Sequence, residues 1–249
     1  MKAMIFAAGL GTRLRPLTND RPKALIEIGG KTMLERVITK LAAAGFDDIT
    51  INIHHFGEKI IDFLEKNGNF GLEIHISDER EMLLDTGGGI LKARPFLDGD
   101  EPFLVHNADI LTDIDLNAMY QNHLKNGAMA TVLVKDRKTS RYFVFDDDYH
   151  LQGWINKSTG ETRPGSFIHR EGMHELAFGG IHVISPSIFD ELEKYSQGQA
   201  KFSITPFYVD ECHNHPINGY VQNTAYTWLD VGKPETLKEA KEVVASINI

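Results

Sequence analysis

The chain has 249 residues, of which 42% are hydrophobic, and its formal net charge is −9. This length and composition can bury one full core, so we expect a single α/β domain over residues 1–249. The acidic balance, with no basic tract, argues against a nucleic-acid partner. A lone cysteine, Cys212, excludes an intrachain disulfide and indicates a reducing compartment, so we expect a cytoplasmic protein.

The first predicted element is an apolar strand over Lys2–Ala7. Its apolar run breaks at Gly9 and Arg13, which makes it too short for a signal peptide or a membrane span. We therefore expect no membrane partner. Small residues after the strand let backbone N–H groups approach a ligand closely, and basic residues beside them complete a cradle for phosphate. The residues expected in this cradle are Ala7, Ala8, Gly9, Gly11, Thr12, Arg13 and Lys23.

Two commoner phosphate-binding motifs do not fit this stretch. A dinucleotide fingerprint starting at Gly9 would need a third glycine where Leu14 stands. Thr32 ends a triplet that imitates a P-loop, but the glycine that should begin such a loop is missing. Because Glu35 follows three residues later, Thr32 is better interpreted as the N-cap of a helix over Met33–Ala44.

Strands alternate with helices in the first half of the chain. The predicted strands are Lys2–Ala7, Ile49–Ile53, Glu73–Ser77, Phe103–His106 and Met129–Val134, and the predicted helices are Met33–Ala44, Phe56–Lys66, Gly87–Ala93 and Leu116–Asn126. Such alternation implies right-handed crossovers and a Rossmann-like, mixed but mostly parallel sheet with helices on both faces. Ligands of these sheets bind outside the carboxyl ends of the strands, where we expect the loop at Gly9 to meet Asn107 and Asp109.

Three glycines, residues 87–89, stand at the start of one predicted helix. Each costs about 1 kcal/mol relative to alanine, so close backbone approach to something flat or anionic is the functional interpretation. A plain helix-entry turn is the alternative. We expect Asp85, Gly87 and Gly88, together with Asn107, to contact a nucleotide.

Two carboxylates, Asp109 and Asp230, each follow a short apolar strand and are expected to point into the cleft. Mg²⁺ prefers one or two carboxylates together with phosphate oxygens and water, and Mn²⁺ is the alternative ion. The competing interpretation makes both aspartates turn residues or caps. Asp113 and Asp115 imitate a D-x-D metal motif, but Asp115 directly precedes a helix and is expected to be its N-cap.

The pattern changes between residues 137 and 179. Arg141–Asp146 and His150–Ile155 predict a hairpin that turns at residues 147–148, followed by a polar stretch and a strand over Gly180–Ile184. We expect a small β insertion beside the cleft. At the end of the chain, Pro234 suits the first turn of a helix over Glu235–Ser246.

The stretch from Gly9 to Leu25 resembles the signature of the sugar-1-phosphate nucleotidyltransferases, G-x-G-T-R-L-x-P-x-T followed by P-K-x-L. Their N-G-D and W-x-D-V-G motifs match residues 107–109 and 228–232, with alanine at position 108 in place of glycine. The resemblance implies an enzyme with a GT-A-like domain that joins an NTP to a sugar 1-phosphate and releases pyrophosphate. In this family the matching acids hold the metal together, and the segment around residue 87 lines the base and ribose.

The resemblance also suggests roles for the remaining site residues. Arg13 would stabilise the pyrophosphate leaving group, and Lys23 would hold the α-phosphate and the incoming sugar phosphate. The insertion would lie over the sugar side of the cleft. There, a lactyl carboxylate on the sugar would need a cation such as Lys157, Arg163 or Arg170.

Within the family, the segments Leu84–Ala93 and Thr112–Asp115 are most similar to the uridylyltransferases for N-acetylmuramate α-1-phosphate, which implies UTP as donor and peptidoglycan recycling. The guanylyltransferases for mannose 1-phosphate or heptose 1-phosphate share nearly all of these motifs and stay open as alternatives. A glycosyltransferase that uses a finished NDP-sugar would need Asp113 rather than the pair of Arg13 and Lys23. A non-catalytic nucleotide-sugar sensor would be expected to lose one of the motif residues, and none is lost.

Overall fold

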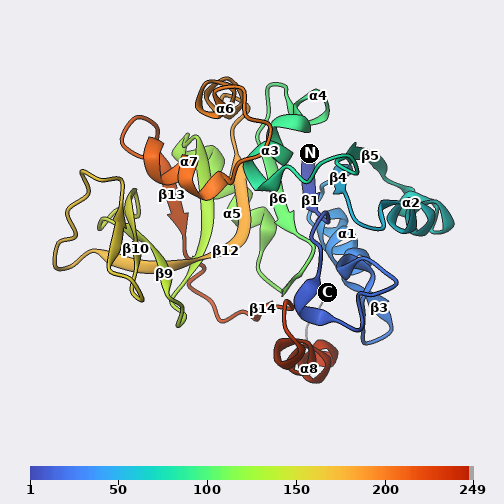
Figure 1. Ribbon diagram of the computed structural model, residues 1–249. Coiled ribbons are helices and arrows are strands. Elements are labelled where there is room, and N and C mark those ends of the chain that lie inside the picture. Colours follow the sequence, from blue (N-terminus) through green and yellow to red (C-terminus); the bar gives the residue numbers. More distant parts are fainter. Residues whose placement is uncertain (247–249) are drawn as a thin grey trace.

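A computed structural model describes residues 1–246, so the last three residues of the predicted domain lie outside the described part (Figure 1). The strands of its main sheet are β1 (Lys2–Phe6), β4 (Asp48–Ile53), β5 (Glu73–Asp78), β6 (Phe103–Asn107), β8 (Ala130–Lys135), β9 (Arg141–Phe145), β10 (Leu151–Asn156), β11 (Glu161–Arg163), β12 (His174–Ile184) and β13 (Ile217–Tyr220). Two further pairs are β2 (Glu27–Ile28) with β3 (Lys31–Thr32), and β7 (Ile110–Thr112) with β14 (Trp228–Asp230).

The main sheet has the order β11-β10-β9-β12-β6-β1-β4-β5, with β8 beside β12 and β13 beside β8. β1 lies between β4 and β6, is parallel to both, and places Ile5 opposite Ile51 and His106. β12 runs antiparallel to β6 and begins the half of the sheet that carries the insertion. The predicted fold class, a mixed sheet with a parallel centre and helices, is confirmed.

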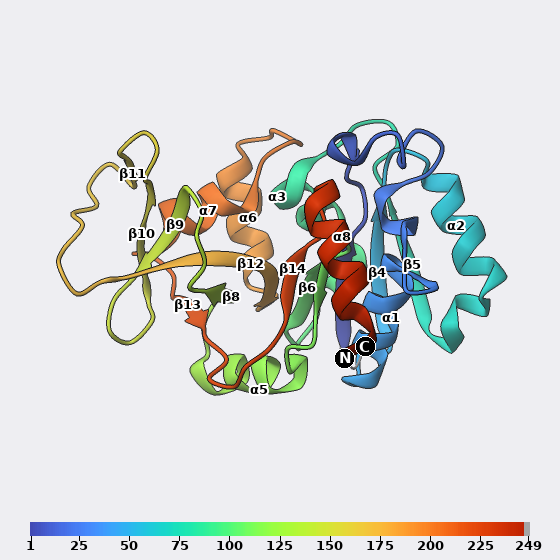
Figure 2. The same cartoon turned by 90° about the horizontal axis from the view of Figure 1, so that it is seen from below.

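Helices cover both faces of this sheet. They are α1 (Met33–Ala43), α2 (Gly57–Lys66), α3 (Asp85–Lys92), α4 (Arg94–Leu97), α5 (Leu116–Asn126), α6 (Ile188–Ser196), α7 (Ile204–Glu211) and α8 (Pro234–Val243), with 3-10 turns η1 (Thr12–Leu14), η2 (Lys23–Leu25), η3 (Gly68–Gly71) and η4 (Val244–Ser246). Since side chains alternate along a strand, Ala3 and Ile5 pack under α1, α2 and α5, whereas Met4 packs under α3, α4, α6 and α7. α8 covers a third apolar cluster that includes Leu14 (Figure 2). Within residues 1–246, every helix is too short or too polar to cross a lipid bilayer.

The predicted helix caps are confirmed. The Glu35 N–H donates to Thr32 Oγ1 at 3.0 Å, and the Ala118 N–H donates to Asp115 Oδ1 at 2.8 Å. Asp113 accepts a hydrogen bond from the Thr227 N–H at 2.6 Å. The two acids that resemble a D-x-D metal motif, Asp113 and Asp115, therefore each accept a hydrogen bond from a backbone N–H group.

The predicted insertion continues the main sheet. β9 and β10 form the expected hairpin, β11 adds a third strand, and β12 is longer than predicted because it starts at His174 (Figure 2). β12 pairs with β9 near its start and with β6 near its end. Its register against β8 shifts between Phe178 and His182, and Gly180 in this stretch has a φ of +72°. Helices α6 and α7 were not predicted from the sequence.

Candidate active site

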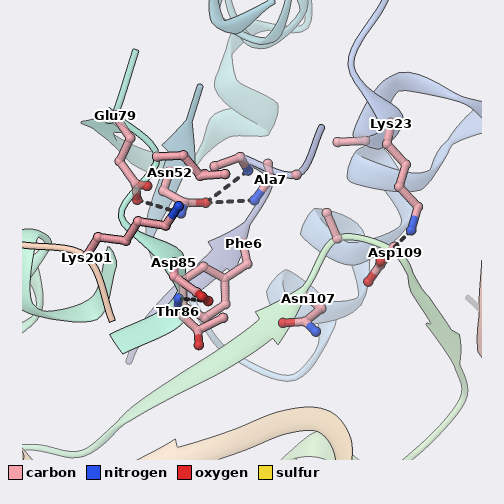
Figure 3. A pocket seen from close by; sticks show the side chains of 15 residues that line it. Phe6, Ala7, Lys23, Asn52, Glu79, Asp85, Thr86, Asn107, Asp109 and Lys201 are labelled. Carbon is pink, nitrogen blue, oxygen red and sulfur yellow. Dashed lines mark hydrogen bonds and ion pairs between the residues drawn. The ribbon is translucent and has the colours of Figure 1, made fainter. Parts of the chain in front are cut away.

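A cavity of about 360 Å³ opens at the carboxyl ends of β1, β4 and β6 (Figure 3). Seven of the predicted site residues line it: Ala7, Ala8, Gly9, Lys23, Asp85, Asn107 and Asp109. Four polar wall residues were not predicted as site residues from the sequence: Asn52, Glu79, Thr86 and Lys201. Asn52 could have been found by the signal that pointed to Asp109, namely a polar residue at the end of a buried strand.

Lys23 and Asp109 form an ion pair at one end of the cavity (Figure 3). Lys23 lies in η2 and is only 9% exposed. The backbone around Asp109 is held on both sides, because the Ala108 N–H donates to Phe6 O at 3.0 Å and the Val231 N–H donates to Asp109 O at 2.9 Å. Ala108 does not adopt a positive φ, so its methyl group is accommodated without backbone strain.

Strand pairing brings Asp230 next to Asp109. β14 runs antiparallel to β7 and sets Asp230 opposite Ile110, the residue after Asp109. Burial raises the pKa of Asp230, the Asp109 carboxylate raises it further, and the cations Lys23, Arg13 and Arg137 oppose both effects. Asp230 Oδ1 is buried and has no hydrogen-bond partner within the described chain. A lone buried carboxylate oxygen beside a second carboxylate fits a divalent cation.

Arg13 lies near Asp230 and not on the wall of the cavity. A Cβ built on Gly232 would come within 2.7 Å of both Arg13 Nη2 and Asp230 Oδ1, so glycine leaves room for these two side chains. Gly11 and Thr12 also lie outside the cavity wall. Gly11 has a φ of +62° and accepts a hydrogen bond from Thr18 Oγ1 at 2.9 Å, so these residues shape the loop that carries Arg13.

The backbone N–H groups of Ala7 and Ala8 are not free to bind a ligand, contrary to the expectation from the sequence. Both N–H groups donate to Asn52 Oδ1, at 2.8 and 3.3 Å. The Asn52 amide in turn donates to Glu79 Oε1 at 2.7 Å, and Glu79 is 1% exposed (Figure 3). A buried network therefore holds the first loop in place, and Ala7 and Ala8 face the cavity without offering those hydrogen bonds.

The N–H groups of Gly87 and Gly88 are also occupied within the chain and are not free to bind a ligand. The expected contact of these two glycines with a nucleotide stays a prediction. Both N–H groups donate to Phe202 O, at 2.9 and 3.1 Å. A Cβ on Gly88 would lie 2.1 Å from Ala200 O, so glycine is required here for the segment between α6 and α7 to pack on α3. Asp85 is exposed at the start of α3 and accepts a hydrogen bond from the Thr86 N–H at 2.7 Å.

A second cavity, of about 520 Å³, lies between the insertion and the start of α7. Its wall combines arginines with aromatic rings: Arg137, Arg141, Arg163, Phe143, Trp154 and Phe178. Of the three cations expected on the insertion, only Arg163 lines this wall. Lys157 pairs with Glu175 at 2.5 Å instead. The walls of the two cavities adjoin at Thr86 and Ser203, whose hydroxyl oxygens are 3.4 Å apart.

A separate cluster of possible metal ligands consists of Asp48, Glu73 and His75. Asp48 and Glu73 are the first residues of β4 and β5, so the cluster lies at the opposite edge of the sheet from both cavities. His75 Nε2 lies 3.3 Å from an oxygen of each acid. This cluster is distinct from the predicted metal pair of Asp109 and Asp230.

A sheet with a parallel centre, a cationic loop and paired aspartates at its carboxyl edge defines a nucleotide-binding enzyme of the α/β class. The chain belongs to the nucleotidyl transferase family, which matches residues 2–246. It is 34% identical to the N-acetylmuramate alpha-1-phosphate uridylyltransferase of Neisseria meningitidis serogroup B over 248 residues, which cover 99% of each chain. It is 32% identical to the mannose-1-phosphate guanyltransferase of Schizosaccharomyces pombe over 240 residues, covering 94% of this chain and 62% of that protein.

A solved structure supports the fold. The putative glucose-1-phosphate thymidylyltransferase of Bacillus anthracis superposes with a TM-score of 0.81 at 18% identity, covering 100% of this chain and 97% of that one. The family expected from the sequence is confirmed, and the protein is an enzyme of the sugar-1-phosphate nucleotidyltransferase class.

Proposed function

We propose that this protein transfers the uridylyl group of UTP to N-acetylmuramate 1-phosphate and releases pyrophosphate, as a step of peptidoglycan recycling. The observation that carries the reaction is the unpartnered, buried Asp230 Oδ1 beside the ion pair of Asp109 and Lys23. The choice of UTP and of the sugar rests on the uridylyltransferase relative, whose whole length this chain matches. We expect the reaction in the cytoplasm, where the free thiol of the buried Cys212 would stay reduced.

The chemistry follows from charge and position. An oxygen of the sugar phosphate forms a bond to the α-phosphorus of the NTP while the bond from that phosphorus to the bridging oxygen breaks. The pyrophosphate leaves with the electron pair. Because the attacking oxygen is already anionic, no general base is required, and catalysis rests on alignment and on neutralising charge.

Arg13 and Lys23 are the cations that we assign to this task. Lys23 reaches the cavity from η2 and would hold the α-phosphate and the incoming phosphate. Arg13 lies near Asp230 and would hold the departing pyrophosphate. Mg²⁺ or Mn²⁺ held by Asp109 and Asp230 would supply further neutralisation of phosphate charge.

A panel of substrates tests the proposal. We expect pyrophosphate release from UTP with N-acetylmuramate 1-phosphate to exceed that from GTP with mannose 1-phosphate or heptose 1-phosphate, measured as kcat/KM. The reverse order would favour a guanylyltransferase, the second candidate, to which the 32% identical guanyltransferase relative points. Absence of pyrophosphate release from every pair would contradict the reaction itself and favour a sensor. A glycosyltransferase has less support, since Asp113 is occupied by the Thr227 N–H.

A further inference from the structure

The second cavity is strongly cationic in an acidic protein. Three arginines line it and face one acid, Glu161, whose carboxylate pairs with Arg163 at 2.8 Å. Three positive charges and one negative charge leave this cavity with a net charge of +2, whereas the whole chain carries −9. A concave site of this charge selects anions.

Arg137 connects this cavity to the aspartates. Its guanidinium lies 4.5 Å from the centre of the Trp228 ring, and Nη2 donates to Phe178 O at 3.1 Å. Its positive charge acts on the Asp230 carboxylate, two residues beyond Trp228. Arg137 Nε is buried and lacks a hydrogen-bond partner among residues 1–246. Arg137 thus lies between the second cavity and the carboxylates, and its buried Nε–H is available to a ligand.

The rest of the wall suits a sugar with a second acidic group. Phe143, Trp154 and Phe178 offer apolar ring surfaces, and Ser203 and Thr205 add hydroxyl groups. Arg163 lies 6.0 Å from the centre of the Trp154 ring. Arginine's planar fork matches a carboxylate or a phosphate through two parallel hydrogen bonds.

We propose that Arg137 binds the phosphate of the acceptor sugar, and that Arg141 and Arg163 bind a carboxylate on the same sugar. This inference rests on the proposed function and extends it, because it assigns the residues that would select an acidic sugar phosphate over a neutral one. A neutral sugar phosphate would use Arg137 and leave the other two arginines without a substrate group.

Intrinsic fluorescence can measure acceptor binding without turnover. The chain has two tryptophans, and both adjoin the proposed site: Trp154 lines the cavity and Trp228 lies beneath Arg137. The full-length protein is titrated with N-acetylmuramate 1-phosphate and with N-acetylglucosamine 1-phosphate, which has the same phosphate and lacks the lactyl carboxylate. We expect the wild-type protein to bind the acidic sugar more tightly.

Variants separate the two roles. Arg163→Met and Arg141→Met should each weaken binding of the acidic acceptor about tenfold and leave the neutral one unchanged, since one charged hydrogen bond is lost. Glu161→Gln should strengthen binding of the acidic acceptor by releasing Arg163. Arg137→Met should weaken both acceptors, and Arg137→Lys should recover part of the loss because it keeps the charge. Arg170→Met, an exposed arginine of the same insertion outside the cavity, is the matched control.

Two outcomes would overturn the inference. Equal losses for both acceptors in Arg163→Met would remove the carboxylate role, and unchanged binding in both Arg137 variants would remove the phosphate role. Thermal unfolding of each variant distinguishes a lost contact from a lost fold. The expected binding pattern without pyrophosphate release from any NTP would support this acceptor site and contradict the proposed reaction.

Discussion

Asp230 shows how one residue can be unfavourable for the fold and useful for the site. The pKa of Asp230 in the folded protein is raised above its ordinary value of 3.8. The protein therefore loses stability as the pH rises through this raised pKa, and at higher pH the loss remains. We expect Asp230→Asn to unfold at a higher temperature than the wild type at pH 7 in chelator. Mg²⁺ should raise the melting temperature of the wild type and leave that of the variant unchanged.

Asp147→Asn is the control for this substitution, because the Asp147 side chain is 96% exposed and should show neither effect. A variant that melts below the wild type in chelator would contradict the assigned burial cost.

Activity of the wild type should vanish in chelator and return with Mg²⁺ or Mn²⁺ but not with Ca²⁺, which prefers more ligands at longer distances.

Arg13 and Lys23 should matter for turnover more than for stability. Each supplies positive charge where negative charge moves during the reaction, so Arg13→Ala and Lys23→Ala should lower kcat at least ~100-fold while the fold is kept. Arg21→Ala is the matched control from the same segment, since Arg21 is exposed and paired with Asp20. Turnover at the wild-type rate in either test variant would remove that residue from the mechanism.

At the scale of elements, the site depends on how α3 packs against the segment that leads into α7. The Gly87 and Gly88 N–H groups and the Thr86 hydroxyl all contact residues 202–204. Within these contacts, Thr86 lines the first cavity and Ser203 lines the second. Gly88→Ala would force Ala200 O away from its 2.1 Å position against the new methyl group. We expect a loss of about 1–3 kcal/mol in unfolding free energy and weaker binding of both substrates.

The control for this prediction is Gly165→Ala. A Cβ at Gly165 meets nothing within 4 Å, and the residue does not have a positive φ. Denaturant unfolding of both variants gives the comparison. If Gly88→Ala and Gly165→Ala had the same stability, the close packing of α3 would not be a constraint on the site.

At the scale of the whole molecule, three of the eleven histidines are buried between the sheet and its helices. Burial lowers the pKa of His106 and His123 to about 4 and that of His182 to about 3. An unfolded chain binds these protons near pH 6.5, so stability is full above that pH and falls as the pH drops towards the folded values. Each histidine contributes up to about 1.4 kcal/mol per pH unit in that window.

Denaturant unfolding between pH 7 and pH 5 measures this effect, because most carboxylates stay ionised there. His182→Leu should flatten the pH dependence, whereas the exposed His213→Gln should leave it unchanged. A wild-type stability that does not change between pH 7 and pH 5 would contradict the assignment of all three histidines as neutral in the folded protein.

The sequence by itself determined the features that depend on neighbours along the chain. Thr32 and Asp115 were predictable as caps because a cap bonds an N–H group three residues away. The alternation of strands and helices predicted the parallel centre of the sheet, and polar residues at strand ends pointed to Asp109 and Asp230. These patterns predict which residues lie at the carboxyl ends of the parallel strands, where ligands bind, because the direction of the strands alone sets that edge of the sheet.

Only the tertiary structure decided which groups at that edge are free. The donors of Ala7 and Ala8 are satisfied by Asn52, and those of Gly87 and Gly88 by Phe202, partners that no local pattern identifies. The pairing of β7 with β14 sets Asp230 beside Asp109, and the carbonyl of Phe178 in β12 accepts a hydrogen bond from Arg137. The physical reason is that a buried polar group must find a partner somewhere in the folded chain, and long-range packing chooses that partner.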